Sequence, residues 1–337
     1  PESVKWNPLD EIRLGTKYET GDIQNLATLL VDPNGKGLDG ADSSSHFFNL
    51  CRSLLTGLIT HVLYLRQENP EFEASLGAVD TLLSAPESQL LEDDFWKAMQ
   101  THQHRKNKKT DQMEPHPLVV KCAQDIINTP TKERGSVLST TRNTVALYRD
   151  EILSQNTSVS EFSIKDLMNY TDPVTLYIIT EETDKERVKP LFRLLLGMIC
   201  RKLASGMTYE KIGESRRAKS PNKHKLLMLI DEFPSFGKLE VIQKSLAFLA
   251  GYGIRFYLIS QDLSQLRSRE EGYGENEAIT SNCHIQIAFT PQKLDTAKYL
   301  SQLTGQTTVS YAEIATSGSR LSLFQSNMTK TYRDVSR

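Results

Sequence analysis

The sequence has little cysteine, and none of it is arranged in a motif. The four cysteines stand far apart, at Cys51, Cys122, Cys200 and Cys283. This spacing argues against a disulfide framework and a zinc ribbon, and it fits a reducing compartment. Three histidines gather at His102, His104 and His116, but no cysteine or carboxylate accompanies them at ligand spacing. We therefore do not predict a metal site among them.

Long apolar runs are missing as well. No segment approaches the roughly 20 apolar residues that a membrane span needs, and the best runs, such as Leu226–Ile230, have the length of a strand. No signal peptide opens the chain, which begins at Pro1 without a Met, so we expect the parent protein to extend further upstream. The net charge of −2 argues against an overall basic coat, but it leaves room for a local basic groove.

The first half of the chain has a helical pattern with few strand signals. Apolar residues recur at helical spacing between Leu50 and Leu63, which predicts a buried helix. Other helices are predicted over residues 23–30, 76–83, 93–100, 119–127 and 137–153. We predict an all-helical domain over residues 21–160, preceded by an extended, turn-rich segment over residues 1–20.

The second half alternates between strand and helix patterns. Strands are predicted at 175–180, 226–230, 255–260, 284–289 and 307–311, and helices at 184–203, 239–250, 264–269 and 293–303. Such alternation is typical of an α/β fold with a mostly parallel sheet and helices on both faces. We assign residues 161–337 to this α/β domain.

Two carboxylates follow the apolar run Leu226–Ile230, which reads as a fully buried strand. Ligands of open α/β sheets bind at the carboxyl ends of the strands. There Asp231 suits a Mg²⁺ ion, held directly or through water, and Glu232 suits the general base that activates water against the γ-phosphate of ATP. The alternative is a strand that simply leaves the core into solvent.

A polar residue in the same position on the next predicted strand supports the catalytic interpretation. Gln261 follows the run Arg255–Ser260, where an amide can sense the γ-phosphate and signal to other subunits. Its alternative role is the start of a solvated loop. With both motifs in order, the sequence favours ATP hydrolysis with ATP and Mg²⁺ as cofactors, and Asp231, Glu232 and Gln261 are the predicted catalytic residues.

The phosphate-binding loop that such chemistry needs is absent from these 337 residues. No GxxxxGK[ST] pattern occurs, and the two Gly-Lys pairs, Gly35-Lys36 and Gly237-Lys238, have neither its spacing nor a preceding buried strand. Without a cradle for the phosphates, we expect this chain alone to bind ATP poorly and to be inactive.

A basic tract interrupts the helical region between His102 and Lys109. Its cations Arg105, Lys106, Lys108 and Lys109 suit DNA phosphate or an acidic partner. The alternative is a solvated loop.

Taken in order, the motifs resemble those of the type IV secretion coupling proteins, the TraG-like family of conjugative DNA pumps. The resemblance is carried by seven segments: Trp6–Asp10, Asp22–Gln24, Gly135–Val137, Leu229–Phe233, Ser260–Leu263, Ile279–Asn282 and Thr304-Gly305. Of these, Leu229–Phe233 and Ser260–Leu263 are similar to the family's Walker B and glutamine motifs. One departure is Ala250, near which some members carry an arginine, so no arginine finger can be named.

The resemblance implies a RecA-like P-loop NTPase core with an inserted all-α domain. Residues 1–20 then end the first part of the nucleotide-binding domain. It also implies a homo-hexamer at the cytoplasmic face of the bacterial inner membrane, anchored by an N-terminal segment that this chain lacks. The implied partners are a relaxase or relaxosome with its single-stranded DNA, protein substrates, and the channel proteins of the type IV secretion system.

Two other function classes remain open from the residues alone. A degenerate motor could recruit cargo without hydrolysis, and an intact P-loop upstream would decide against it. A metal-dependent nuclease could use Asp231 and Glu232, but the neighbouring strand offers Gln261 where a further acidic residue is needed.

Overall fold

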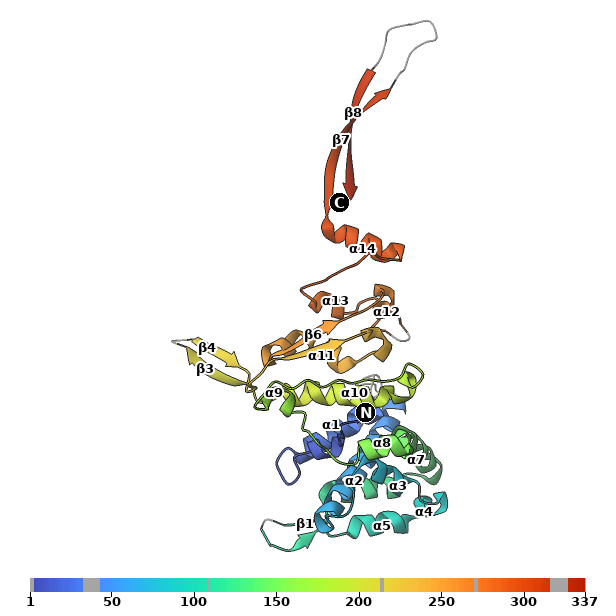
Figure 1. Cartoon of the computed structure of the whole chain (residues 1–337). Helices are drawn as coiled ribbons and strands as arrows, with labels where there is room; N and C mark the ends of the chain where they lie inside the picture. Colours follow the sequence, from blue (N-terminus) through green and yellow to red (C-terminus); the bar gives the residue numbers. More distant parts are fainter. Residues whose placement is uncertain are drawn as a thin grey trace. The chain divides into compact units, whose positions relative to one another are not determined.

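The computed structural model describes residues 3–32, 43–107, 109–212, 215–269, 272–315 and 327–336 (Figure 1). The chain divides into two compact units. Unit 1 comprises Pro1–Ile230 and Ser235–Leu258, and unit 2 comprises Asp231–Pro234 and Ile259–Arg337. Each unit is described below by itself.

The amino-terminal part of unit 1 is a helical assembly, as the apolar periodicity predicts. Its elements are η1 (Pro8–Glu11), α1 (Glu19–Val31), α2 (Ser43–Glu68), α3 (Leu76–Leu83), α4 (Glu87–Leu91), α5 (Asp93–Thr101), α6 (Pro117–Asn128), α7 (Thr131–Val145), η2 (Ala146–Arg149) and α8 (Glu151–Asn156). The helices predicted over 23–30, 50–63, 76–83, 93–100 and 119–127 are confirmed within longer or slightly shifted helices. The single helix predicted over 137–153 is wrong, because the chain leaves helical geometry at Asp150 and α7, η2 and α8 are separate elements. The sequence did not predict helix α4, nor the short hairpin of strands β1 (Arg105–Lys106) and β2 (Met113–Glu114) between α5 and α6.

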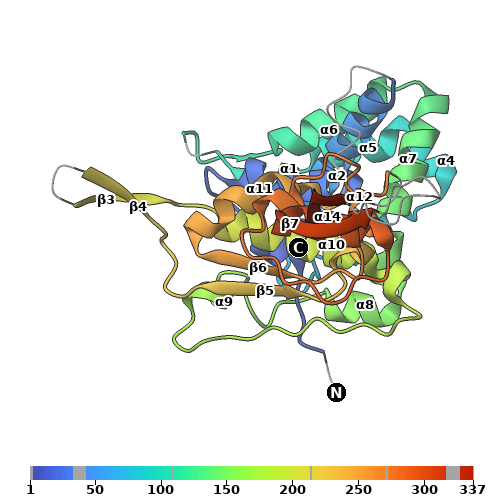
Figure 2. The ribbon, with the colours of Figure 1, turned by 90° about the horizontal axis from the view of Figure 1, so that it is seen from above.

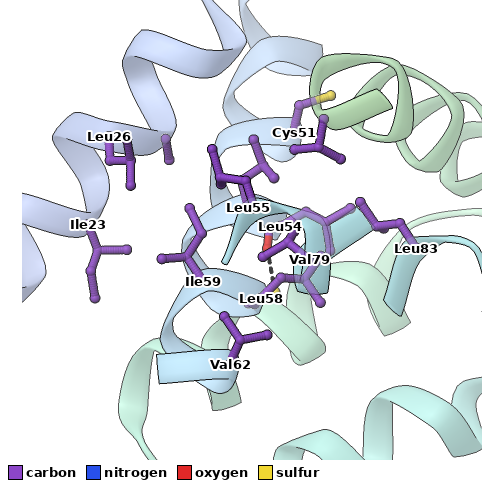
Figure 3. Packing of buried hydrophobic residues seen from close by; sticks show 14 of the residues in the cluster. Ile23, Leu26, Cys51, Leu54, Leu55, Leu58, Ile59, Val62, Val79 and Leu83 are labelled. Carbon is purple, nitrogen blue, oxygen red and sulfur yellow. Dashed lines mark hydrogen bonds between the residues drawn. The ribbon is translucent and has the colours of Figure 1, made fainter. Parts of the chain in front are cut away.

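Helix α2 is the centre of the hydrophobic core (Figure 3). Its side chains Leu54, Leu55 and Leu58 are fully buried among residues of α1 and α3. By length and composition α2 could cross a membrane, with a mean hydropathy of 1.2 over its most apolar window. Most of that window is buried inside the protein, which is how the core helix of a folded domain behaves.

The rest of unit 1 contains a parallel strand pair. Its elements are α9 (Asp166–Asn169), α10 (Lys185–Leu203), β3 (Thr208–Ile212), β4 (Ser215–Lys219), β5 (Leu226–Ile230), η3 (Phe233–Phe236), α11 (Glu240–Leu249), η4 (Ala250–Tyr252) and β6 (Ile254–Leu258), of which η3 starts in unit 2. Strands β5 and β6 lie side by side in parallel, with Leu226 opposite Ile254 and Ile230 opposite Leu258 (Figure 2). Both strands and their parallel direction are as predicted.

Unit 2 holds α12 (Leu263–Arg267), α13 (Ile279–Asn282), α14 (Leu294–Thr304) and the long antiparallel hairpin of β7 (Gln306–Ala315) and β8 (Asn327–Ser336). The sequence predicted the helices near α12 and α14. It predicted the start of β7 as a strand of the parallel sheet, which is wrong, because β7 pairs antiparallel with β8 instead.

Three further strand expectations are wrong. Residues 175–180 and 284–289 form no strand, and their apolar side chains are exposed, with Ile179 at 85% and Phe289 at 88%. β-Propensity expresses packing against a neighbouring strand, and no described strand pairs with either segment. Strand β5 was expected to be fully buried, yet Leu227 and Leu229 are each 61% exposed because only one face of the pair is covered by described residues.

Candidate functional site

The predicted catalytic residues lie just beyond the carboxyl ends of β5 and β6. Asp231 and Glu232 follow Ile230 directly, and Gln261 follows β6 by three residues. The side-chain amide nitrogen Nε2 of Gln261 donates a hydrogen bond to Oε1 of Glu232 at 2.9 Å. The structure thus brings together two residues that are 29 positions apart in the sequence.

Glu232 has an unusual backbone conformation. Its φ of 54° lies in the left-handed region, which is sterically costly for a residue other than glycine. The next residue holds it there: the Phe233 N–H donates to the carbonyl oxygen of Ile259 at 2.8 Å. The Phe233 ring is 1% exposed and stacks on Tyr273, with 5.8 Å between ring centroids. Packing of Phe233 therefore fixes the direction in which the Glu232 side chain leaves the backbone.

Asp231 is exposed, and its carboxylate makes no hydrogen bond or ion pair with any residue that the structure describes. Within the described ranges, no group of three His, Cys, Asp or Glu side chains is arranged to hold a metal ion. The carboxylates of Asp231 and Glu232 fit the way proteins hold Mg²⁺, which uses one or two carboxylates and leaves the remaining positions to waters and substrate phosphates.

Asp262, next to Gln261, organises the loop after β6. Its carboxylate caps α12 by accepting the Ser264 N–H at 2.7 Å, and it also accepts from the Thr296 hydroxyl at 3.3 Å. Lys293 lies 3.4 Å away. The Ser264 N–H and the positive charge of Lys293 hold the pKa of Asp262 below its usual range. This capping role was not predicted, although Asp262-Leu263-Ser264 is a recognisable capping pattern.

The described residues of the basic tract include strand β1 and the start of the turn that leads to β2. Arg105 pairs with Glu114 at 3.0 Å across the hairpin, and Lys106 lies 3.7 Å from Asp111. Lys109 is exposed in the turn, and Lys108 lies outside the described residues. Of the four predicted contacts, Arg105 is thus already engaged by a carboxylate of the protein.

The three histidines of this region each contact a different side chain, although the ring centroids of His102 and His104 are only 4.8 Å apart. His102 contacts Glu68 at 3.0 Å, His104 contacts His61 at 2.9 Å, and His116 contacts Glu19 at 2.8 Å. Each has a separate partner, so the histidines stabilise the fold around the hairpin. His61, on α2, was not singled out from the sequence, since its partner is 43 residues away.

Comparison with protein families gives one match that spans the whole chain. The sequence pattern of the family described as "Type IV secretory system Conjugative DNA transfer" matches residues 1–337.

Curated proteins similar to this chain include a TraG protein and a VirD4 protein. A conjugal transfer protein TraG from Escherichia coli is 48% identical over 335 residues, which is 99% of this chain and 50% of that protein. A VirD4 protein of Agrobacterium fabrum is 31% identical over 182 residues, covering 54% of this chain and 25% of that protein. The chain thus spans about half the length of the TraG relatives it matches.

Solved structures of a bacterial conjugative coupling protein, TrwB, share the fold. The unbound form covers 98% of this chain and 63% of that chain, with a TM-score of 0.62 and 19% identity. A TrwB complex with ADP and Mg²⁺ covers 83% of this chain and 55% of that chain, with a TM-score of 0.53 and 20% identity.

Proposed function

This chain belongs to the family of type IV secretion proteins for conjugative DNA transfer, and from that premise we propose that it is the ATPase core of a coupling protein. The full-length protein delivers relaxase-bound single-stranded DNA, or protein substrates, to the secretion channel. It works as a homo-hexamer at the cytoplasmic face of the inner membrane, through an anchor outside these residues. The carrying observation is the hydrogen bond between Gln261 and Glu232 beyond the parallel strands β5 and β6.

The proposed division of labour follows from the positions of the side chains. Asp231 is exposed and without a described partner, so its carboxylate is available to a Mg²⁺ ion through water. Glu232 accepts the proton of the attacking water as the general base. Gln261 holds the Glu232 carboxylate through its Nε2 amide, and its contact changes when a γ-phosphate is bound or lost. Mg²⁺ with ATP supplies charge neutralisation at the phosphates when bound.

The fold assignment extends this proposal. We assign residues 161–337 to a RecA-like core and residues 21–160 to an inserted all-α domain. Residues 1–20 end the first part of the nucleotide-binding domain. The parallel pair β5–β6 and the likeness to TrwB support the assignment. TrwB is known in complex with ADP and Mg²⁺, which supports the same cofactors here. The 337 residues carry no phosphate-binding loop, so the chain alone is proposed to be inactive.

Plasmid transfer tests the proposal in its biological setting. A strain that lacks the full-length protein is complemented with the wild type, with Glu232→Gln, or with Glu275→Gln. Glu275 is an exposed carboxylate of the same unit with no assigned role. Glu232→Gln is expected to abolish transfer, and Glu275→Gln to transfer like the wild type. Normal transfer with Glu232→Gln would remove the catalytic assignment.

A further inference from the structure

A pocket lies beneath the β1–β2 hairpin in unit 1, away from Asp231 in the sequence. Its volume is about 820 Å³, within the range of ligand pockets. Three segments line this open pocket: the turn Gly15–Lys17 before α1, the last turn of α2 from Tyr64 to Glu68, and the hairpin itself. The walls come from segments far apart in the sequence, so the sequence alone could not reveal the pocket.

The carboxylates that line the pocket are all engaged by the protein. Glu19 accepts from Tyr64 Oη at 2.9 Å and contacts His116 at 2.8 Å. Glu114 is bound by Arg105 at 3.0 Å and by Asn107 Nδ2 at 2.7 Å. The remaining carboxylate, Glu68, is paired with a histidine. The negative charge of each carboxylate is thus already partly balanced by a hydrogen-bond donor of the protein.

Two of the lysines that line the pocket have no carboxylate partner among the described residues. Lys17 and Lys109 are exposed, and neither ammonium pairs with a carboxylate in the described parts of the chain. The Lys17 ammonium lies 5.0 Å from the centre of the Tyr18 ring, a contact that leaves its N–H donors available. The pocket therefore presents two donor groups of positive charge, one on each side, and favours an anionic ligand.

Two neutral side chains at the rim specify the ligand further. The exposed amide of Gln67 forms no hydrogen bond with the described residues, and an amide can donate to and accept from the edge of a nucleic-acid base. Met113 is 45% exposed and offers an adaptable apolar contact to a ring. A pocket of this volume has room for an unstacked nucleotide, and single strands present such nucleotides.

We propose that this pocket is a subsite for single-stranded DNA, in which Lys17 and Lys109 bind backbone phosphates and Gln67 meets a base edge. The inference rests on the proposed function, because it names where the transferred strand contacts the helical domain. Lys17 and Gln67 are far from Lys109 in the sequence, and only the fold brings them to the same pocket. The other anionic occupant, an acidic peptide, uses the lysines but leaves Gln67 and Met113 without a role.

Binding of a labelled oligo(dT) to the chain, measured by fluorescence anisotropy across a salt series, tests the subsite. No ATP is added, so the result does not depend on the assignment of the chain as an ATPase. The variant Lys17→Gln/Lys109→Gln is expected to bind more weakly at low salt. Its log–log salt slope falls by about 1.4, or about 0.7 for each lost phosphate contact. The matched control is Lys132→Gln, an exposed lysine on α7 that does not line the pocket.

Gln67→Ala separates a base contact from a purely electrostatic one. It should weaken oligo(dT) binding while leaving the salt slope unchanged, because no phosphate contact is lost. An unchanged slope in the double lysine variant would overturn the proposal. A second result would also overturn it: a poly-glutamate peptide displaces oligo(dT) from the wild type, and the Gln67→Ala variant binds oligo(dT) as tightly as the wild type does. That outcome would assign the pocket to an acidic peptide.

Discussion

At the residue scale, the candidate site depends on contacts between residues that are far apart along the chain. Five apolar residues followed by Asp231 and Glu232 place two carboxylates at the end of a strand. The left-handed backbone of Glu232 has no local signal, because it depends on Phe233 packing against Tyr273, 40 residues further along the chain. The role of Asp262 likewise needs Lys293 and Thr296, which only the fold brings near.

A close approach in the core gives a prediction at the same scale. A Cβ at Gly57 would overlap the Cβ and Sγ atoms of Cys122 on α6, whereas one at Gly135 on α7 has nothing within 4 Å. Gly57→Ala is expected to lower the free energy of unfolding by about 1–3 kcal/mol through overpacking. Gly135→Ala is expected to raise it by about 0.5–1 kcal/mol through helix propensity. Urea unfolding of both variants checks this, and equal stabilities would contradict the packing of α2 against α6.

At the element scale, helices were predicted well and strands poorly. The periodicity of α2 and α3 is an intrinsic property of each segment, so their positions follow from the sequence. Residues 175–180 and 284–289 have strand composition, yet a strand exists only where a neighbour pairs with it. The β1–β2 hairpin was missed for the opposite reason. Its strands have two residues each, too few for any periodic signal. The position of the hairpin is instead stabilised by tertiary contacts.

One of those contacts joins the buried His104 to the half-buried His61 on α2. The His116 N–H donates to Nδ1 of His104 at 3.1 Å, so the neutral ring carries its proton on Nε2, which points at Nδ1 of His61 at 2.9 Å. A second proton on either ring would break a hydrogen bond. Burial, reinforced by neighbouring histidines, lowers the pKa of His61 to about 4 and that of His104 to about 3.

The resulting pH dependence is predictable in sign. In the unfolded chain both histidines titrate near their ordinary pKa of about 6.5, so below that pH the unfolded state binds more protons than the folded state. Stability is therefore full above about pH 6.5 and declines as the pH falls towards 4. Tyr64, Glu68, His102 and Arg105 also face this pair, so the comparison is made between variants.

Urea unfolding between about pH 7.5 and pH 5 measures the effect. The wild type should lose stability over this range, and the variant His61→Gln/His104→Gln should lose much less. His46→Gln is the control, because the His46 side chain is 69% exposed and should leave the wild-type dependence intact. A wild type with the same stability at both ends of the range would contradict the neutral pair.

At the scale of the whole molecule, family membership was predictable because the motifs keep their order along the entire chain. The match over residues 1–337 agrees with that prediction. The chain nevertheless spans about half of its TraG relatives, and its 337 residues contain no phosphate-binding loop. ATP hydrolysis should therefore be measured in the full-length protein. The chain of 337 residues serves as the comparison without a phosphate-binding loop.

The most direct test of the account is ATP turnover by the full-length protein in the presence of single-stranded DNA. Glu232→Gln is expected to lower turnover by about 10²–10⁴, the loss typical of a missing general base, while ATP binding survives because Asp231 is intact. The chain of 337 residues alone is expected to show no turnover, since it has no cradle for the phosphates. Turnover by Glu232→Gln at the wild-type rate would contradict the assignment of Glu232 as the base.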